Sequence, residues 1–169
     1  MIQNNKNKLL KAGILNAKNE INWFLQKRFN ITKEHIYSNN FTLNKKQTAL
    51  FNNFIERRIT KEPFQYIINM APFLGVDLYV DPSVLIPRQE TEIIINILIK
   101  KKYYFNSALD IGTGSGNLAL SLAKMNIAEN IIALDNSRNC LKVAGKNMEH
   151  HNIKNVKLLH LHYLNQPIK

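Results

Sequence analysis

Residues 108–123 read ALDIGTGSGNLALSLA, and this stretch decides the fold. An apolar run ends at Ile111, three of the chain's six glycines follow at alternate positions, and a second apolar run begins after Gly116. Glycine adopts backbone angles that other residues avoid, and its lack of a side chain lets a ligand approach the main chain. The pattern predicts a tight turn between a buried strand and a helix, at the sheet edge where ligands bind in such folds.

Strand and helix patterns alternate along the rest of this region. Aliphatic runs predict strands over 107–111, 130–135 and 155–161. Apolar residues at helical spacing predict helices over 117–125 and 137–151. This β-α-β-α-β order predicts an α/β fold with a parallel sheet and right-handed crossovers, and three strands amount to the first half of a doubly wound sheet.

The N-terminal part of the chain has a different pattern. Apolar residues recur at helical spacing over residues 7–29, which predicts one or two amphipathic helices. Thr32 and Thr42 are candidate N-caps of two further helices. We therefore expect a small helical bundle over residues 1–62.

A third pattern begins at Pro63. Aromatic and β-branched residues flank Gly75, and an Asp-Pro turn follows at 81–82, which together predict a β-hairpin. We expect this hairpin linker to cover residues 63–88 and the α/β domain to cover residues 89–169.

Composition excludes several classes of protein. The longest apolar run, residues 93–99, is too short to span a membrane, and the N-terminus lacks the apolar block of a signal peptide. A single cysteine, Cys140, excludes an internal disulfide. These features predict a cytoplasmic protein without a membrane partner.

Formal net charge is +11, which is typical of many nucleic-acid-binding proteins. The lysines are nevertheless spread along the chain, and the one block, residues 100–102, ends a predicted helix, where cations suit the helix dipole. A nucleic-acid partner is therefore the less favoured interpretation.

The spacing of the glycines excludes two nucleotide motifs. A Walker loop requires Lys-Ser/Thr after Gly116, and the dinucleotide fingerprint requires glycine at position 117, but Asn117 and Leu118 follow. What remains is D-x-G-x-G-x-G, with Asp135 at the end of the next predicted strand. A carboxylate there is placed to accept hydrogen bonds from both ribose hydroxyls of a nucleoside.

This glycine turn resembles the S-adenosylmethionine site of the class I methyltransferases, which have a Rossmann-like fold. The resemblance implies that the amino acid end of the cofactor lies over the glycines, that Asp110 meets its ammonium group, and that Tyr163 stacks on the purine. The implied cofactor-binding residues are Asp110, Gly112, Thr113, Gly114, Ser115, Gly116, Asp135 and Tyr163.

A second motif narrows the family. Residues 84–98 read VLIPRQETEIIINIL and resemble the Pro-Arg-x-Glu-Thr-Glu signature of the protein-glutamine methyltransferases that modify peptide chain release factors. The resemblance implies methyl transfer to the glutamine nitrogen of a Gly-Gly-Gln loop, a monomeric full-length enzyme, and a helical domain that docks the release factor. The implied substrate-side residues are Pro87, Arg88, Glu90 and Thr91.

A structural interpretation of this motif stays open. Glu90 and Glu92 would also suit the positive end of a helix dipole, and the sequence leaves open whether Arg88 contacts a ligand or holds the loop.

The chain departs from the family pattern at three places. Asn69 stands where the family has glycine in a turn, and His162 stands where an acid lies near the adenine. The family's catalytic Asn-Pro-Pro-Tyr does not occur in the 169 residues, so this chain has no predicted catalytic residue. We therefore expect an incomplete chain with little turnover, in which the strand 107–111 is an open apolar edge.

The sequence also admits two other functions. The chain could be a methyltransferase for RNA or DNA amines, or a partner-binding fragment without catalysis. His160 and His162 alternate along a predicted strand and so share a face, but no third ligand accompanies them, and we expect no metal.

Overall fold

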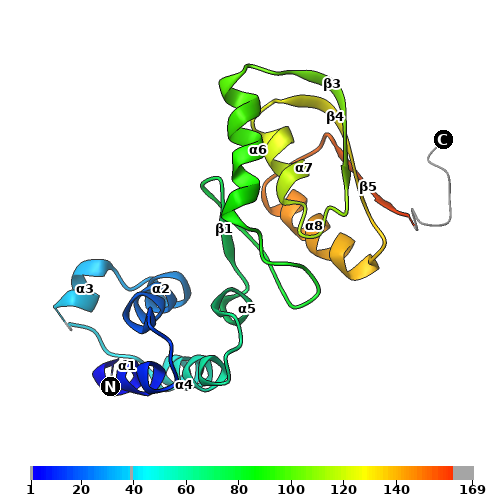
Figure 1. The fold of residues 1–169 in the computed structure, drawn as a ribbon. Helices are drawn as coiled ribbons and strands as arrows, with labels where there is room; N and C mark the ends of the chain where they lie inside the picture. Colours follow the sequence, from blue (N-terminus) through cyan, green and yellow to red (C-terminus); the bar gives the residue numbers. More distant parts are fainter. Residues whose placement is uncertain (1, 39, 162–169) are drawn as a thin grey trace. The chain divides into compact units, whose positions relative to one another are not determined.

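The computed structural model describes residues 2–38 and 40–161 of the chain (Figure 1). The chain divides into two compact units, of which one ends at Ile68 and the other begins at Asn69. This boundary lies after the short helix α5, Phe64–Ile68, and not after Glu62, because α5 packs with the helices that precede it.

The first unit contains five helices among the described residues. They are α1 (Ile2–Lys11), α2 (Ala17–Phe29), α3 (Lys33–Tyr37), α4 (Lys45–Ile59) and α5 (Phe64–Ile68). Aromatic rings fill the space between α2, α4 and α5, and the rings of Phe24 and Phe54 stack with their centroids 4.4 Å apart. Such stacked, buried rings stabilise a core beyond their area alone. The predicted helical bundle is confirmed.

The helix caps were predicted in part. Thr32 caps α3, because its hydroxyl accepts a hydrogen bond from the amide of His35. The prediction that Thr42 caps α4 is wrong. Asn44 caps that helix in a capping box with Gln47, in which each side chain accepts a hydrogen bond from the other residue's amide, at 2.9 and 3.0 Å. This reciprocal pair satisfies two amides that would otherwise lack partners.

The second unit begins with the predicted hairpin. Strands β1 (Ala71–Phe73) and β2 (Val76–Leu78) pair antiparallel. Leu74 and Gly75 connect them with φ angles of 47° and 76°. Two positive φ angles in a two-residue connection are typical of the turn that matches the twist of paired strands.

The rest of the second unit has the predicted α/β order. Its elements are α6 (Gln89–Lys100), β3 (Phe105–Ile111), α7 (Asn117–Lys124), β4 (Ala128–Asp135), α8 (Arg138–His150) and β5 (Val156–His160). The three strands β3, β4 and β5 are parallel and lie in that order, with Asp110 opposite Ala133 and Asp135 opposite His160. The α/β fold class is therefore confirmed.

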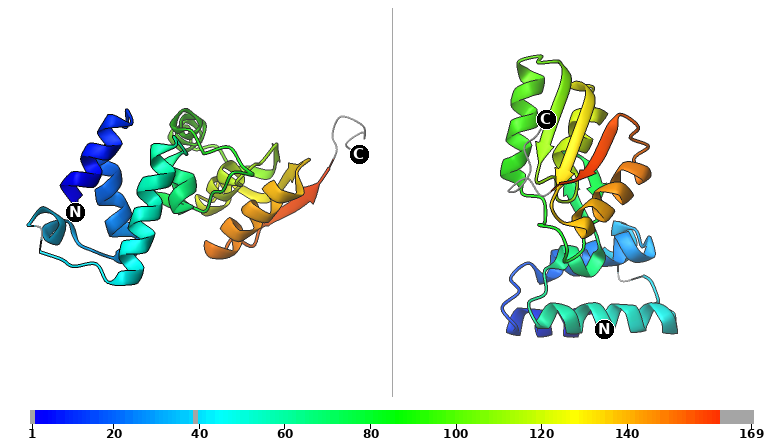
Figure 2. Two further views of the ribbon diagram at one scale, coloured as in Figure 1. Left: turned by 90° about the horizontal axis from the view of Figure 1, so that it is seen from below. Right: turned by 90° about the vertical axis from the view of Figure 1, so that its right-hand side faces the viewer.

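The three helices lie on one face of this sheet, as Figures 1 and 2 both show. Side chains of β4 that point to the helices are buried, such as Ile131 and Ala133, at 1% and 0% exposure. On the opposite face the apolar side chains of Leu109, Ile111 and Ile132 are exposed by 46%, 53% and 39%. Within the described residues, β3 pairs only with β4. The part of the chain described here therefore presents an apolar sheet face beside an unpaired strand edge.

Among residues 2–38 and 40–161, no helix combines the length and the hydropathy needed to cross a membrane.

The exposed face and edge predict self-association. We expect the 169-residue chain to form larger species as its concentration rises, because an unpaired apolar strand pairs readily with another chain. Leu109→Lys with Ile111→Lys should shift the population toward the monomer in sedimentation velocity. Leu15→Lys is the matched control, because Leu15 is 87% exposed in the other unit. A chain that stays monomeric without substitution would contradict this expectation.

Candidate functional site

The glycine turn joins β3 to α7, and the end of β4 holds its backbone (Figure 1). The amides of Gly112 and Thr113 both donate to the carbonyl of Leu134, at 2.9 and 3.0 Å. The amide of Gly116 donates back to the carbonyl of Thr113, at 2.8 Å. All three glycines have positive φ angles, between 56° and 80°. The turn therefore needs glycine for its conformation, as the sequence predicted.

The three glycines differ in their surroundings. A Cβ atom added at Gly112 would meet nothing within 4 Å, and one added at Gly114 would meet only a carbonyl oxygen at 4.0 Å. At Gly116 an added Cβ would lie 2.9 Å from the side chain of Met148 and 3.2 Å from that of Ala144. The first two glycines thus leave open space beside the backbone, while the third lets the turn pack against α8.

Asp135 lies at the end of β4 and connects the turn to α8. Its side chain is 6% exposed, and its two oxygens accept hydrogen bonds from the amides of Gly114 and Ser137, at 3.0 and 2.9 Å. Ser137 in turn caps α8 by accepting from the amide of Cys140. The structure therefore brings Asp135 and the glycine turn together and fixes the orientation of the carboxylate.

Asp110 is a second carboxylate at the same edge. The hydroxyl of Thr113 donates to it at 2.7 Å. Burial raises the pKa of Asp110 above its ordinary value, and the negative charge of Asp135 raises this pKa further, against the opposing effect of the hydrogen bond from Thr113. Among the described residues, no cation forms an ion pair with Asp110. A ligand with a positive group would relieve the cost of this charge.

Ser115 lies between the second and third glycines of the turn. It is 2% exposed, and within the described residues its hydroxyl has no hydrogen-bond partner. Its carbonyl accepts a hydrogen bond from the side-chain amide of Asn147, at 2.8 Å.

The predicted substrate-side residues lie at the start of α6. Arg88 occupies the N-cap position with an extended backbone, Pro87 precedes it, and the amide of Thr91 donates to the carbonyl of Arg88 at 3.1 Å. The side chains of Arg88 and Glu90 are exposed. No hydrogen bond or ion pair links these four residues to the glycine turn in the described part of the chain.

The last acid of the motif has a structural contact. The carboxylate of Glu92 accepts a hydrogen bond from the amide of Leu74, at 3.0 Å, in the turn of the hairpin. Glu92 therefore holds the hairpin to the first turn of α6. A role at the positive end of the helix dipole does not predict this contact.

Asn147 is the residue of this site that the sequence interpretation missed. It lies on the buried face of α8 beside Val143, Ala144 and Met148, where helical spacing predicts an apolar residue. A carboxamide in an apolar stripe was the available signal, because buried polar groups are almost always hydrogen-bonded.

Four further positions were singled out from the sequence, namely Asn69, His160, His162 and Tyr163. Tyr163 and His162 lie outside the described residues. The ring nitrogen Nε2 of His160 lies 3.1 Å from the carbonyl oxygen of Asn136, and the described residues contain no group of three metal-ligand side chains. Asn69 has a φ angle of 53°, which asparagine tolerates, and its side chain donates to the carbonyl of Val80 at 3.1 Å.

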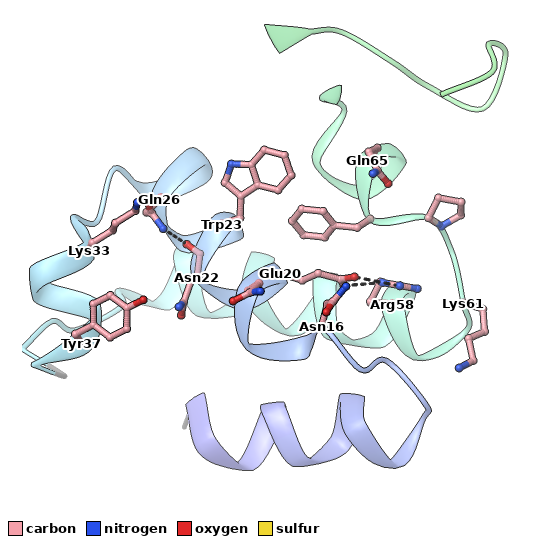
Figure 3. A pocket seen from close by; sticks show the side chains of 13 residues that line it. Asn16, Glu20, Asn22, Trp23, Gln26, Lys33, Tyr37, Arg58, Lys61 and Gln65 are labelled. Atoms are coloured by element: carbon pink, nitrogen blue, oxygen red, sulfur yellow. Dashed lines mark hydrogen bonds and ion pairs between the residues drawn. The ribbon is translucent and has the colours of Figure 1, made fainter. Parts of the chain in front are cut away.

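The helical unit contains a cavity of about 880 Å³ (Figure 3). Trp23 forms one wall and stacks on Phe64, with ring centroids 5.6 Å apart. Arg58 and Glu20 also line the cavity and form a two-point ion pair, at 2.7 and 3.2 Å, as the dashed lines in Figure 3 show. Five of the other lining residues carry carboxamide side chains, namely Asn16, Asn19, Asn22, Gln26 and Gln65.

Both units of the chain match families of known proteins. Residues 1–68 match the family described as PrmC N-terminal domain, and residues 106–167 match a methyltransferase domain. In sequence, the chain is 34% identical over 144 residues to a release factor glutamine methyltransferase of Geobacter sulfurreducens, with 85% of this chain and 51% of that protein covered. A second relative with this name, from Buchnera aphidicola subsp. Schizaphis graminum, is 44% identical over 126 residues, with 74% and 46% covered.

A solved structure supports the fold alone. The Trm5b protein of Pyrococcus abyssi superposes with a TM-score of 0.50 at 20% identity, over 59% of this chain and 30% of that one. The parallel sheet, the glycine turn and the matched domain thus define the first part of a class I methyltransferase domain. Its N-terminal unit matches the PrmC N-terminal domain, and over most of its length the chain is similar to release factor glutamine methyltransferases. It spans about half the length of these relatives.

Asp110 gives a prediction with a definite sign. Because its pKa in the folded chain lies above the ordinary value of 3.8, the folded chain holds this proton more tightly than the unfolded chain. The contribution to the free energy of unfolding is therefore fully present below pH 3.8 and is lost as pH rises through the folded pKa. Asp110→Asn should raise the melting temperature by a few degrees at neutral pH. This gain should vanish below pH 3.8, where the carboxyl group of Asp110 is protonated in both the folded and the unfolded chain.

Asp81 supplies a control with the opposite sign. Burial opposes its ionisation, but hydrogen bonds from Ser83 and Tyr79 outweigh burial and lower the pKa of Asp81 below 3.8. Asp81→Asn should therefore lower the melting temperature at neutral pH in the same calorimetric scans. Equal effects of the two substitutions would show that burial of Asp110 is not the cause.

Proposed function

We propose that this chain is the cofactor-binding part of an enzyme that transfers a methyl group from S-adenosylmethionine to a glutamine side-chain nitrogen in the Gly-Gly-Gln loop of a peptide chain release factor, in the cytoplasm. One observation carries the proposal. The open side of the glycine turn lies beside two carboxylates, and among the described residues Asp110 has no cationic partner.

The residues present fit this cofactor. Gly112 and Gly114 leave space for the amino acid end of the cofactor, and Asp110 would accept a hydrogen bond from its ammonium group. Each oxygen of Asp135 accepts one backbone amide, and carboxylate oxygens have further lone pairs for the two ribose hydroxyls. We assign Tyr163 to the purine from the family resemblance, since it lies outside the described residues.

The reaction needs orientation more than acid or base strength. When bound, the cofactor supplies an electrophilic methyl group on a sulfonium. The amide nitrogen is a poor nucleophile because its lone pair is delocalised into the carbonyl, so the protein must hold nitrogen, methyl and sulfur in line. The residues described here would fix the cofactor end of that line. Asn-Pro-Pro-Tyr, which grips the amide in the family, does not occur in the 169 residues, and we propose little turnover by this chain alone.

A protein substrate is better supported than a nucleic acid. Both relatives named above are release factor glutamine methyltransferases, and residues 87–92 resemble the Pro-Arg-x-Glu-Thr-Glu signature of that family. The observation that favours RNA or DNA is the net charge of +11. We propose Pro87, Arg88, Glu90 and Thr91 as substrate-side residues, since the exposed side chains of Arg88 and Glu90 are accessible to a protein partner.

We further propose that the helical unit docks the release factor at the cavity of Figure 3. A carboxamide offers both a donor and an acceptor, so the five that line the cavity can pair with the main chain of an inserted segment. Trp23 offers an aromatic wall, and aromatic residues are enriched where protein partners bind. The exposed side chain of Lys33 adds positive charge at the cavity, whereas Glu20 is already paired with Arg58.

The cofactor assignment predicts a single binding site in calorimetry with S-adenosylmethionine. Asp135→Asn should weaken this binding by about tenfold, because it replaces a charged acceptor by a neutral one. The control is Glu129→Gln, which removes the same charge from an exposed position near the other end of β4. Binding that is unaffected by Asp135→Asn, or weakened equally by both variants, would contradict the assignment.

The docking assignment predicts a charge-sensitive complex with a labelled release factor. Lys33→Glu should weaken this complex by about tenfold in fluorescence anisotropy, because it reverses a charge at the cavity. Lys8→Glu, at an exposed position on α1 that does not line the cavity, is the control and should change the affinity little. Preferential binding of RNA over release factor would favour the nucleic-acid alternative.

A further inference from the structure

Asn147 on α8 has a side chain that is completely buried and fully hydrogen-bonded. Its oxygen accepts a hydrogen bond from the amide of Tyr79, at 2.7 Å. Its nitrogen donates two hydrogen bonds, to the carbonyl of Tyr79 at 3.0 Å and to the carbonyl of Ser115 at 2.8 Å. Both protons of the carboxamide and its oxygen are therefore used, and all three partners are backbone groups.

These partners come from two distant segments. Tyr79 follows strand β2 of the hairpin and lies 68 positions from Asn147 in the sequence, and Ser115 lies in the glycine turn, 32 positions away. One side chain thus holds the segment that leaves the hairpin and the turn at the proposed cofactor site.

The segment after β2 follows α8 through further contacts. The carbonyl of Asp77 lies 3.0 Å from Nε2 of His151, Asn147 holds Tyr79, and the thiol of Cys140 donates to the carbonyl of Ser83 at 3.1 Å. Residue numbers increase along this segment while those of its partners on α8 decrease, so the segment and the helix run antiparallel. This segment leads directly to residues 84–88, which precede α6.

The glycine turn lies against the same part of α8. Gly116 leaves no space for a side chain beside Met148 and Ala144, the neighbours of Asn147 on that helix. Van der Waals contact therefore holds the turn at Gly116, and the hydrogen bond from Asn147 holds it at Ser115.

We propose that Asn147 is a positioning residue for the cofactor site. It fixes the carbonyl of Ser115, and hence the open side of the glycine turn, and it links that turn to the segment that leads to Arg88. The inference rests on the proposed binding of S-adenosylmethionine at the turn. It adds that binding at the turn also orders the backbone at Tyr79, because both are held by one carboxamide.

Asn147→Asp tests the proposal with an isosteric change. The carboxylate can still accept from the amide of Tyr79, but it cannot donate to the carbonyls of Tyr79 and Ser115. We expect the dissociation constant for S-adenosylmethionine, measured by calorimetry well below the melting temperature, to rise by about tenfold or more.

Asn155→Asp is the matched control. The side-chain nitrogen of Asn155 also donates to two backbone carbonyls, those of Ala128 and Glu129, at 3.3 and 2.9 Å, but at the opposite end of the sheet. This variant should lose two similar hydrogen bonds and keep the cofactor affinity. A merely structural role for Asn147 predicts a lower melting temperature with unchanged affinity, and that result would overturn the proposal.

Hydrogen exchange on the unsubstituted chain provides a second test that needs no variant to fold. Addition of S-adenosylmethionine should slow amide exchange at Tyr79 as well as at Gly114. Protection of Gly114 without any change at Tyr79 would overturn the proposed link and leave the cofactor site intact. Absence of any binding of S-adenosylmethionine to the unsubstituted chain would overturn both the link and the proposed function.

Discussion

The hydrogen bond from the amide of Gly114 to the buried carboxylate of Asp135 is the contact on which the site depends. It joins the ends of two neighbouring parallel strands, and the carbonyl of Leu134 strengthens the same connection by accepting two amides of the turn. Asp135 also accepts the amide of Ser137, so that the turn and the start of α8 share one anchor. A turn held in this way keeps its open side before any ligand arrives, which reduces the ordering cost of binding.

Much of this arrangement could be predicted from the sequence because its signals are local. Alternating strand and helix patterns fixed the order of elements, and the glycines with Asp110 and Asp135 marked the site at the carboxyl edge of the sheet. Asn147 could not be assigned in this way, since its partners lie 32 and 68 positions away and only the folded chain brings them together. The cap of α4 was missed for a different reason, because Asn44 with Gln47 competes better than Thr42 for the same helix end.

The proposed function and stability oppose each other at Asp110. Burial without a cationic partner among the described residues makes its charge costly, yet this cost is what makes it suited to a ligand with an ammonium group. The apolar side chains of Leu109 and Ile111 are also exposed although they belong to a strand of the sheet. The chain spans about half the length of these relatives, and the features described here concern the part that it shares with them.

The most direct test is a titration of the isotope-labelled chain with S-adenosylmethionine, followed by two-dimensional NMR of the backbone amides. We expect the largest shift changes at Gly112 to Gly116 and at Asp135 to Ser137, with little change in the helical unit. Unchanged spectra, or changes confined to residues around the cavity of the helical unit, would contradict the assignment of the glycine turn as the cofactor site.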